Sequence, residues 1–196
     1  RWDDLAQAYA KAIEVASDDT DKIALMAKLA KLDAQKLGRN DEAVDVLKKI
    51  LELDAENIDA LRLLESIYAA ENKSAELLEI RSTLALLTFE PDAQKALLFQ
   101  CADLALNVLN LNERGMGFLE KIVEIDDTDI NAIDPLLVLY SEAGAFDKYV
   151  ELLNKKLLST NDDDARFDIY MTIAKTADEK LDDAAMAIDA YNDAKN

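Results

Sequence analysis

Hydrophobic residues recur along this chain at the three- and four-residue spacing of amphipathic helices. Val44, Leu47, Ile50 and Leu51 follow this spacing. Because an α-helix has 3.6 residues per turn, such residues share one face and leave polar residues on the other. The pattern predicts eleven helices, at residues 2–17, 21–37, 41–53, 58–71, 74–88, 92–109, 113–125, 130–143, 146–158, 163–180 and 182–195.

The residues between these segments have the chemistry of helix ends. Asn40, Asn57 and Asn112 stand where a side-chain oxygen could cap the first free N–H groups of a helix. Gly38 and Gly144 stand where a helix C-terminus favours a left-handed residue. With only 4 Gly and 2 Pro in 196 residues, the chain has too few turn formers for a sheet protein built from tight hairpins. The expected fold class is therefore all-α.

The sequence repeats itself with a 72-residue period. When residues 40–68 are placed over residues 112–140, ten of 29 positions are identical, among them Leu64 with Leu136 and Tyr68 with Tyr140. Each period contains two units of about 36 residues, and each unit contains two helices. The eleven helices therefore form five pairs, preceded by one helix that aligns with the second helices of later pairs. We expect residues 1–196 to be a single repeat domain and a slice of a longer array.

Within the repeat, one pattern resembles the tetratricopeptide-repeat (TPR) family. The pattern is Ala43, Leu47 and Ile50, then the turn at 53–57, then a helix that carries Leu61, Leu64 and Tyr68; its first position recurs at Gly115. Such a likeness, close to bacterial-type TPR arrays, implies a right-handed α-solenoid of stacked antiparallel helix pairs. The chain departs from the family pattern where a small residue is expected before the tyrosine, since Glu65 and Leu137 stand there. Pro135 also lies in the first turns of a predicted helix, where it should delay or kink the helix.

The resemblance also implies a function. In TPR arrays the first helix of each pair lines a concave groove that binds a peptide or a partner domain, so the chain is expected to be a protein–protein interaction scaffold. Carried over position by position, the candidate partner-binding residues are Lys28, Gln35, Arg62, Ser66, Gln100, Asn107, Val138, Ser141, Thr172 and Thr176.

Charge narrows the choice of partner. The net charge is −19, and it is spread over the whole chain. Such a surface repels phosphate backbones and anionic lipid headgroups, so we expect neither nucleic acid nor a membrane as partner. A basic or mixed-charge protein is favoured, and salt should weaken its attraction. The single cysteine, Cys101, lies in an apolar stretch and is expected to be buried, in keeping with a reducing, cytoplasmic setting.

Catalytic chemistry finds little support in the residues. The chain has no histidine, which excludes Ser-His, Cys-His and His-metal sites, and its glycines do not form a phosphate loop. Acidic clusters at 18–21, 126–129, 162–164 and 182–183 could bind a divalent cation, but helix capping explains them more simply. Tyr68 and Tyr140 are expected to be core residues, because they occupy equivalent repeat positions. The chain is therefore predicted to be neither an enzyme nor a cofactor-binding protein.

Three functional hypotheses remain open at this stage. The first is the interaction scaffold. The second is a structural spacer or self-association module without a peptide ligand, and the third is a module that binds a small ligand or metal through its acidic turns. The oligomeric state is not determined by the sequence.

Overall fold

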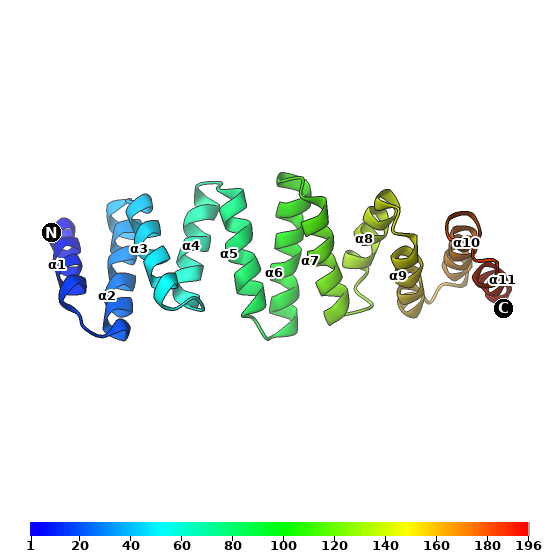
Figure 1. Cartoon of the computed structure of the whole chain (residues 1–196), viewed down its shortest axis with the longest axis horizontal. Helices are drawn as coiled ribbons and strands as arrows, with labels where there is room; N and C mark the ends of the chain where they lie inside the picture. Colours follow the sequence, from blue (N-terminus) through cyan, green and yellow to red (C-terminus); the bar gives the residue numbers. More distant parts are fainter. Residues whose placement is uncertain (196) are drawn as a thin grey trace. The chain divides into compact units, whose positions relative to one another are not determined.

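The computed structural model describes residues 1–195, which contain eleven α-helices, two short π-helical segments and no strand. This confirms the predicted all-α class and the number of helices. The helices are α1 (Trp2–Val15), α2 (Asp19–Leu32), α3 (Asn40–Leu53), α4 (Ile58–Ala70), α5 (Ser74–Leu86), α6 (Pro91–Asp103), α7 (Asn112–Ile125), α8 (Ile130–Ala143), α9 (Phe146–Ser159), α10 (Asp163–Lys180) and α11 (Ala184–Asp193) (Figure 1). The π-helical segments, η1 (Asp33–Leu37) and η2 (Leu104–Val108), continue α2 and α6.

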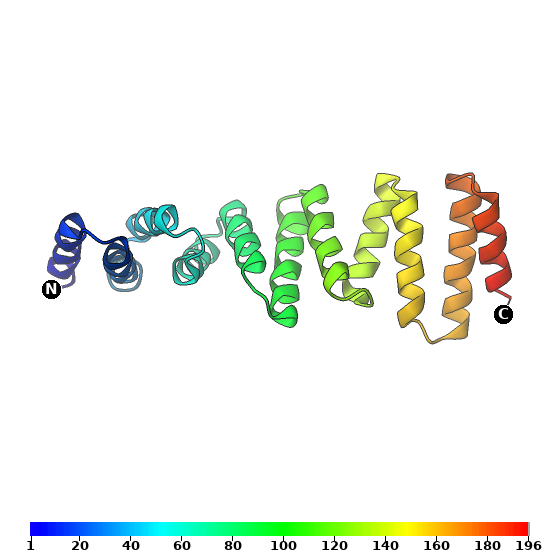
Figure 2. The ribbon, with the colours of Figure 1, turned by 60° about the horizontal axis from the view of Figure 1, so that its bottom comes forward.

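The chain divides into two compact units, Arg1–Leu97 and Leu98–Asn196. In the first unit α2 pairs with α3 and α4 with α5, while α1 packs on α2. In the second unit η2 packs on α7, α8 pairs with α9, and α10 pairs with α11. Within each unit, consecutive helices run antiparallel and lie side by side (Figures 1 and 2). The predicted helix pairing is confirmed, and the expectation of a single domain stays a prediction.

Left-handed residues mark the repeat in the backbone. Gly38, Asn110 and Asp182, each one period after the last, have φ angles of 67°, 55° and 53°. Asn72 and Gly144, also one period apart, have φ angles of 55° and 69°. Each of these residues follows the first helix of a pair, so the period specifies where every first helix ends. The predicted roles of Gly38 and Gly144 are confirmed.

Helix starts repeat as well. The carboxylates of Asp18, Glu90 and Asp162, again one period apart, each accept a hydrogen bond from the backbone N–H three positions later, at 3.2, 2.6 and 2.8 Å. Asn57 caps α4 in the same way at 3.0 Å, as predicted.

The predicted caps at Asn40 and Asn112 are wrong. Both are the first helical residues, and Arg39 and Leu111 hold the cap positions without a side-chain hydrogen bond. The Asn40 amide instead donates to Glu71 Oε1 at 2.7 Å. Pro135 lies inside α8, which begins at Ile130, so the proline does not delay the helix start.

Many core residues repeat. Five identical pairs, each separated by one period, are buried in both copies: Leu47 and Leu119, Ile50 and Ile122, Ala60 and Ala132, Leu64 and Leu136, Tyr68 and Tyr140. Cys101 is buried too, as predicted. Burying these side chains is the main source of stability in such an array, because one helix pair alone leaves its apolar face in water.

Candidate partner-binding surface

In the first unit, the candidate residues lie on the solvent-exposed face of the first helices, opposite the buried core residues. We call this the outward face. Arg62 and Ser66 of α4 are exposed, on the opposite side of the helix from the buried Leu64 and Tyr68. Lys28 of α2 is exposed as well.

Lys28 and Gln35 also line an open cavity of about 240 Å³ between α1 and α2. The other lining residues are Trp2, Leu5, Tyr9, Lys31, Leu32 and Lys36. The cavity therefore has an apolar floor and three lysines at its rim.

In the second unit, the exposed candidates are Gln100 of α6, Asn107 of η2, and Val138 and Ser141 of α8. Val138 is 57% exposed, which is high for a branched apolar side chain. The Asn107 amide donates a hydrogen bond to Asp103 Oδ1 at 2.7 Å. These four side chains can contact a partner without any change of the helices that carry them.

Two threonines on α10 differ from the expectation. Thr176 is only 9% exposed and Thr172 is half-buried. Their hydroxyls donate to the backbone carbonyls of Thr172 and Asp168, each at 2.8 Å. Thr176 lies two periods after Leu32, which is also buried, so its repeat position belongs to the core. Thr176 is therefore not available to a partner.

Most exposed first-helix positions do not repeat, in contrast to many buried ones; Ile58 and Ile130 are an exposed pair that does. One period apart, Arg62 corresponds to Asp134 and Ser66 to Val138, and all four are exposed. The same two helices, α4 and α8, share Ala60 with Ala132, Leu64 with Leu136 and Tyr68 with Tyr140 in the core. The sequence thus keeps several packing residues and varies most exposed residues on the same helices.

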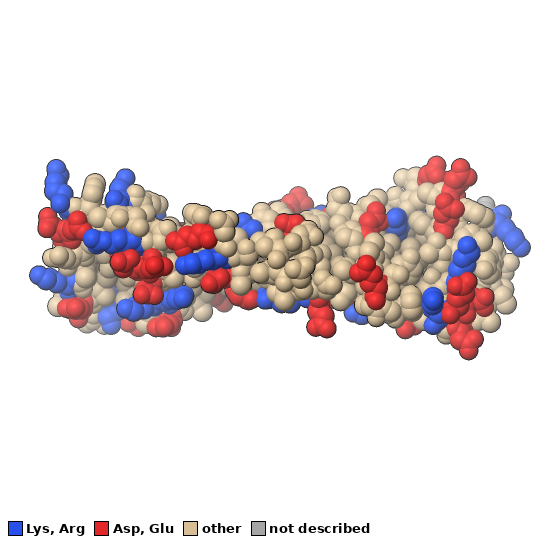
Figure 3. All heavy atoms as spheres, turned by 90° about the horizontal axis from the view of Figure 1, so that it is seen from above, with Lys and Arg blue, Asp and Glu red and all other residues tan. Residues whose placement is uncertain are grey.

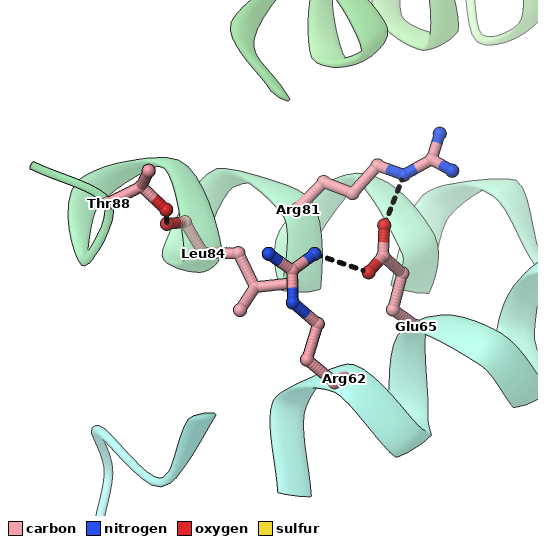
Figure 4. Close-up of polar contacts among 5 residues, drawn as sticks. All are labelled: Arg62, Glu65, Arg81, Leu84 and Thr88. Atoms are coloured by element: carbon pink, nitrogen blue, oxygen red, sulfur yellow. Dashed lines mark hydrogen bonds and ion pairs between the residues drawn. The ribbon is translucent and has the colours of Figure 1, made fainter. Parts of the chain in front are cut away.

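A three-residue ionic cluster joins α4 to α5 (Figure 4). Glu65 accepts a hydrogen bond from Arg62 Nη1 at its Oε2 and from Arg81 Nε at its Oε1, both at 3.0 Å. The side chains of Glu65 and Arg81 are 17% and 21% exposed, whereas that of Arg62 is 51% exposed. We call Arg62, Glu65 and Arg81 the arginine–glutamate cluster; it carries two positive charges and one negative charge.

A second polar centre lies between α7, α8 and α9 in the second unit. Glu120 Oε1 accepts hydrogen bonds from the Tyr140 hydroxyl at 2.7 Å and from Lys148 Nζ at 2.8 Å. Burial alone would raise the pKa of Glu120, but the hydrogen bonds from Lys148 and Tyr140 outweigh it and lower that pKa. Burial and the neighbouring carboxylate raise the pKa of the Tyr140 hydroxyl.

These residues border an open cavity of about 240 Å³. Its apolar lining comes from Val123, Leu136, Tyr140 and Leu152, and its charged rim from Glu120, Glu124, Lys148, Glu151 and Lys155. Tyr140 contributes to the floor of this cavity but is itself only 7% exposed, which confirms that it is a core residue.

The net negative charge is spread along the whole sequence, but charged side chains are distributed unevenly over the surface. On the face shown in Figure 3, basic side chains gather among acidic ones over the N-terminal helices of the first unit.

Acidic residues at the helix starts act as caps: Asp129 accepts from Asn131 N at 3.1 Å and Asp183 from Met186 N at 2.9 Å. Among residues 1–195, no group of three or more His, Cys, Asp or Glu side chains is placed to hold a metal ion. None of the helices in this part of the chain is long and apolar enough to cross a membrane.

No family model and no curated protein matches the chain. Among solved structures it is similar to MamA, with 16% identity over 85% of this chain and 92% of that one, and a TM-score of 0.41. It is similar to a tetratricopeptide repeat protein from Parabacteroides merdae, with 17% identity over 96% of this chain and 70% of that one, and a TM-score of 0.45. YrrB, described as a TPR protein with an unusual peptide-binding site, has 18% identity over 97% of this chain and 93% of that one, with a TM-score of 0.44.

These identities and TM-scores do not identify a ligand. The fold is assigned from the paired helices and the repeated positions of the chain itself. The fold is TPR-like. The small residue near the start of α3 (Ala43) and of α7 (Gly115) is buried, as the TPR pattern requires.

Sequence reasoning about the TPR-like pairs proposed Arg62 as a partner-binding residue, named Glu65 only as a departure from the family pattern, and did not name Arg81. The available signal was the departure of Glu65 from the repeat, since Leu137 stands one period later. Arg81 departs in the same way, because its equivalent is Leu153. Glu65 on α4 and Arg81 on α5 thus replace two leucines with residues of opposite charge on neighbouring helices. This pattern indicates that the two side chains are in contact.

Proposed function

We propose that this chain is a non-enzymatic protein-interaction scaffold and that the outward faces of its first helices bind a peptide or a domain of a partner protein. One observation supports the proposal above all. On α4 and α8 the buried residues Ala60, Leu64 and Tyr68 recur one period later, whereas most exposed residues differ, Ile58 and Ile130 excepted. Packing alone requires the first property but not the second, whereas recognition of a specific partner needs an irregular exposed surface on a regular support.

The charge of the chain indicates what kind of partner fits. A net charge of −19 attracts a protein with basic residues, and the Lys and Arg side chains on the first unit add sites for acidic ones. A partner with both basic and acidic residues fits the net negative charge and the basic side chains of the first unit. Because these charges are largely exposed, raising the salt concentration should weaken binding by slowing association. A cytoplasmic setting stays a prediction.

Site-specific photocrosslinking tests the proposal. A photoreactive amino acid is placed at Ser66 on α4 or at Val138 on α8, and in control variants at Lys49 on α3 or at Lys121 on α7. The two lysines are exposed and lie at equivalent positions one period apart, on the second helices of their pairs. The crosslinkers are activated in extracts of the cells that make the protein. We expect discrete adducts from Ser66 and Val138 and none from the lysine positions.

The same experiment distinguishes the proposed scaffold function from its alternatives. Equal adducts from all four positions, or adducts from the lysines alone, would contradict binding at the first helices. An adduct of twice the chain mass, together with concentration-dependent sedimentation, would instead support self-association. The double variant Arg62→Glu with Gln100→Lys should keep the helical content and lose the discrete adducts, because both positions are exposed and neither belongs to the core.

A further inference from the structure

Two members of the arginine–glutamate cluster, Glu65 and Arg81, occupy positions that are leucine one period later. Glu65 and Arg81 lie one period before Leu137 and Leu153, which are 7% and 4% exposed. The first unit therefore has a half-buried ion pair between α4 and α5 at positions that α8 and α9 give to apolar core residues. Replacing a half-buried ion pair by well-packed apolar residues is often neutral or stabilising. Packing thus gives no reason for the ion pair, and another role has to account for it.

The geometry of the cluster leaves donors free. Glu65 uses one oxygen for Arg81 Nε and the other for Arg62 Nη1. A guanidinium group has five N–H donors, and the remaining nitrogens of both arginines have no protein partner among residues 1–195. Figure 4 shows both terminal nitrogens of Arg81 pointing away from the Glu65 carboxylate. A single carboxylate thus holds two cations in place without neutralising them.

We propose that the arginine–glutamate cluster is a recognition site for the side-chain carboxylate of an Asp or Glu residue in the partner protein. This inference rests on the proposed scaffold function and adds the chemical class of one partner residue. An incoming carboxylate would accept hydrogen bonds from the two terminal nitrogens of Arg81, the planar pairing that guanidinium groups favour, while the nearby charge of Arg62 adds attraction. Glu65 holds both arginines before binding, so less side-chain freedom is lost when the partner arrives.

The position of the cluster fits this role. Arg62 lies on the exposed face of α4 beside Ser66, and Glu65 joins it to Arg81, so a peptide that lies along this face passes the cluster. The acidic remainder of the chain would repel a uniformly acidic peptide. The fitting ligand is therefore a mixed-charge segment with one acidic residue placed at the cluster.

Selection from a random peptide library displayed on phage tests the inference, with the wild-type chain and the double variant Glu65→Leu/Arg81→Leu as targets. The displayed peptides are joined to the coat protein at their C-termini, so only side chains can supply a carboxylate. We expect wild-type chain to enrich peptides with an Asp or Glu at one fixed position and the double variant to lose this preference. For a selected peptide made synthetically, Glu→Gln at that position should weaken binding to the wild-type chain by about tenfold or more, as loss of a charged hydrogen-bond partner does.

Two controls make the outcome decisive. The double variant places at 65 and 81 the residues that α8 and α9 bury, so its helical content and unfolding midpoint should match or exceed those of the wild type. If it does not fold, the single variant Arg81→Gln takes its place. Peptides that bind the first helices with no acidic preference, or that bind the double variant equally well, would overturn the inference while the scaffold function stands. Failure to enrich any peptide that depends on Ser66 or Val138 would count against the scaffold function itself.

Discussion

The hydroxyl of Tyr140 on α8 donates a 2.7 Å hydrogen bond to Glu120 on α7, whereas Tyr68, its equivalent one period earlier, has no acceptor at the corresponding position. The residue equivalent to Glu120 is Lys48, which cannot accept a hydrogen bond. Both tyrosine rings are buried, at 7% and 4% exposed. Two tyrosines with the same packing role therefore differ in one polar contact.

This difference predicts unequal effects of removing the two hydroxyls. Tyr140→Phe should lower the free energy of unfolding by about 1–2 kcal/mol, because a buried hydrogen bond to a carboxylate is lost. Tyr68→Phe should change it by less than about 0.5 kcal/mol, since no such bond is broken. Urea denaturation followed by circular dichroism measures both. Equal losses would show that the Tyr140–Glu120 bond contributes nothing to stability.

The lowered pKa of Glu120 predicts a pH-dependent contribution from the same group. Its pKa in the folded chain lies below the ordinary value of 4.5. The ionised form is therefore favoured by folding, and the stability it contributes is fully present above pH 4.5 and is lost as the pH falls through the folded-state pKa.

Glu120→Gln keeps an acceptor for Tyr140 but removes the charge that attracts Lys148. The variant should be less stable than the wild type at pH 7, by up to about 1 kcal/mol. The difference should narrow below pH 4.5, where Glu120 of the wild type becomes protonated. Urea midpoints of both proteins, measured between pH 3 and pH 7, test this. A difference that does not depend on pH would contradict the assigned role of the charge.

Two glycines on α7 predict opposite effects of the same substitution. A Cβ added at Gly115 would lie 2.3 Å from Leu106 Cδ2 and 2.4 Å from its Cγ, whereas a Cβ at Gly117 would meet nothing within 4 Å. Gly115→Ala should therefore destabilise the chain by about 1–3 kcal/mol through overpacking. Gly117→Ala should stabilise it by about 0.5–1 kcal/mol, because alanine loses less backbone freedom in a helix. Thermal unfolding of the two variants distinguishes them, and stabilisation by both would mean that Leu106 moves aside freely.

Much of this fold could be predicted from the sequence because packing residues repeat and helix ends use few residue types. The repeat period located the core at positions such as Leu64 and Leu136, and glycine located two of the left-handed helix ends. The exact start of a helix was harder to predict. At Asn40 and Asn112 the sequence does not show which residue is the last non-helical one. An asparagine at the first helical position gives the same local sequence pattern as an asparagine at the cap.

The candidate surface was less predictable than the core. Thr176 was predicted to face the groove by carrying over the TPR positions, although comparison with Leu32 at the same repeat position would have assigned it to the core. The contact between Glu65 and Arg81 joins two helices, so no spacing within one helix reveals it. Packing sets no requirement on exposed residues, so the repeat locates the core but does not say which exposed residues bind a partner.

The last prediction concerns a carboxylate in the core of the first unit. Asp33 in η1 is only 5% exposed, whereas Ala105 and Ala177, at the same position one and two periods later, are buried alanines. Burial raises the pKa of Asp33 above its ordinary value of 3.8, and the Arg39 guanidinium offsets this only in part. A raised pKa means that folding disfavours the ionised form, so at neutral pH this charge lowers the stability of the fold.

Asp33→Ala should therefore increase the free energy of unfolding at pH 7 by about 1 kcal/mol, within the range of other single stabilising substitutions. The uncharged Asp33→Asn variant, which has nearly the same shape, should show part of the increase and so separates charge from size. The advantage of both variants over the wild type should shrink as the pH falls through the folded-state pKa of Asp33 towards 3.8, where the wild-type carboxylate becomes neutral. Urea midpoints at pH 7 and pH 4 provide the comparison. A variant less stable than the wild type at pH 7 would show that Asp33 strengthens the fold through its interaction with Arg39 more than its burial weakens it.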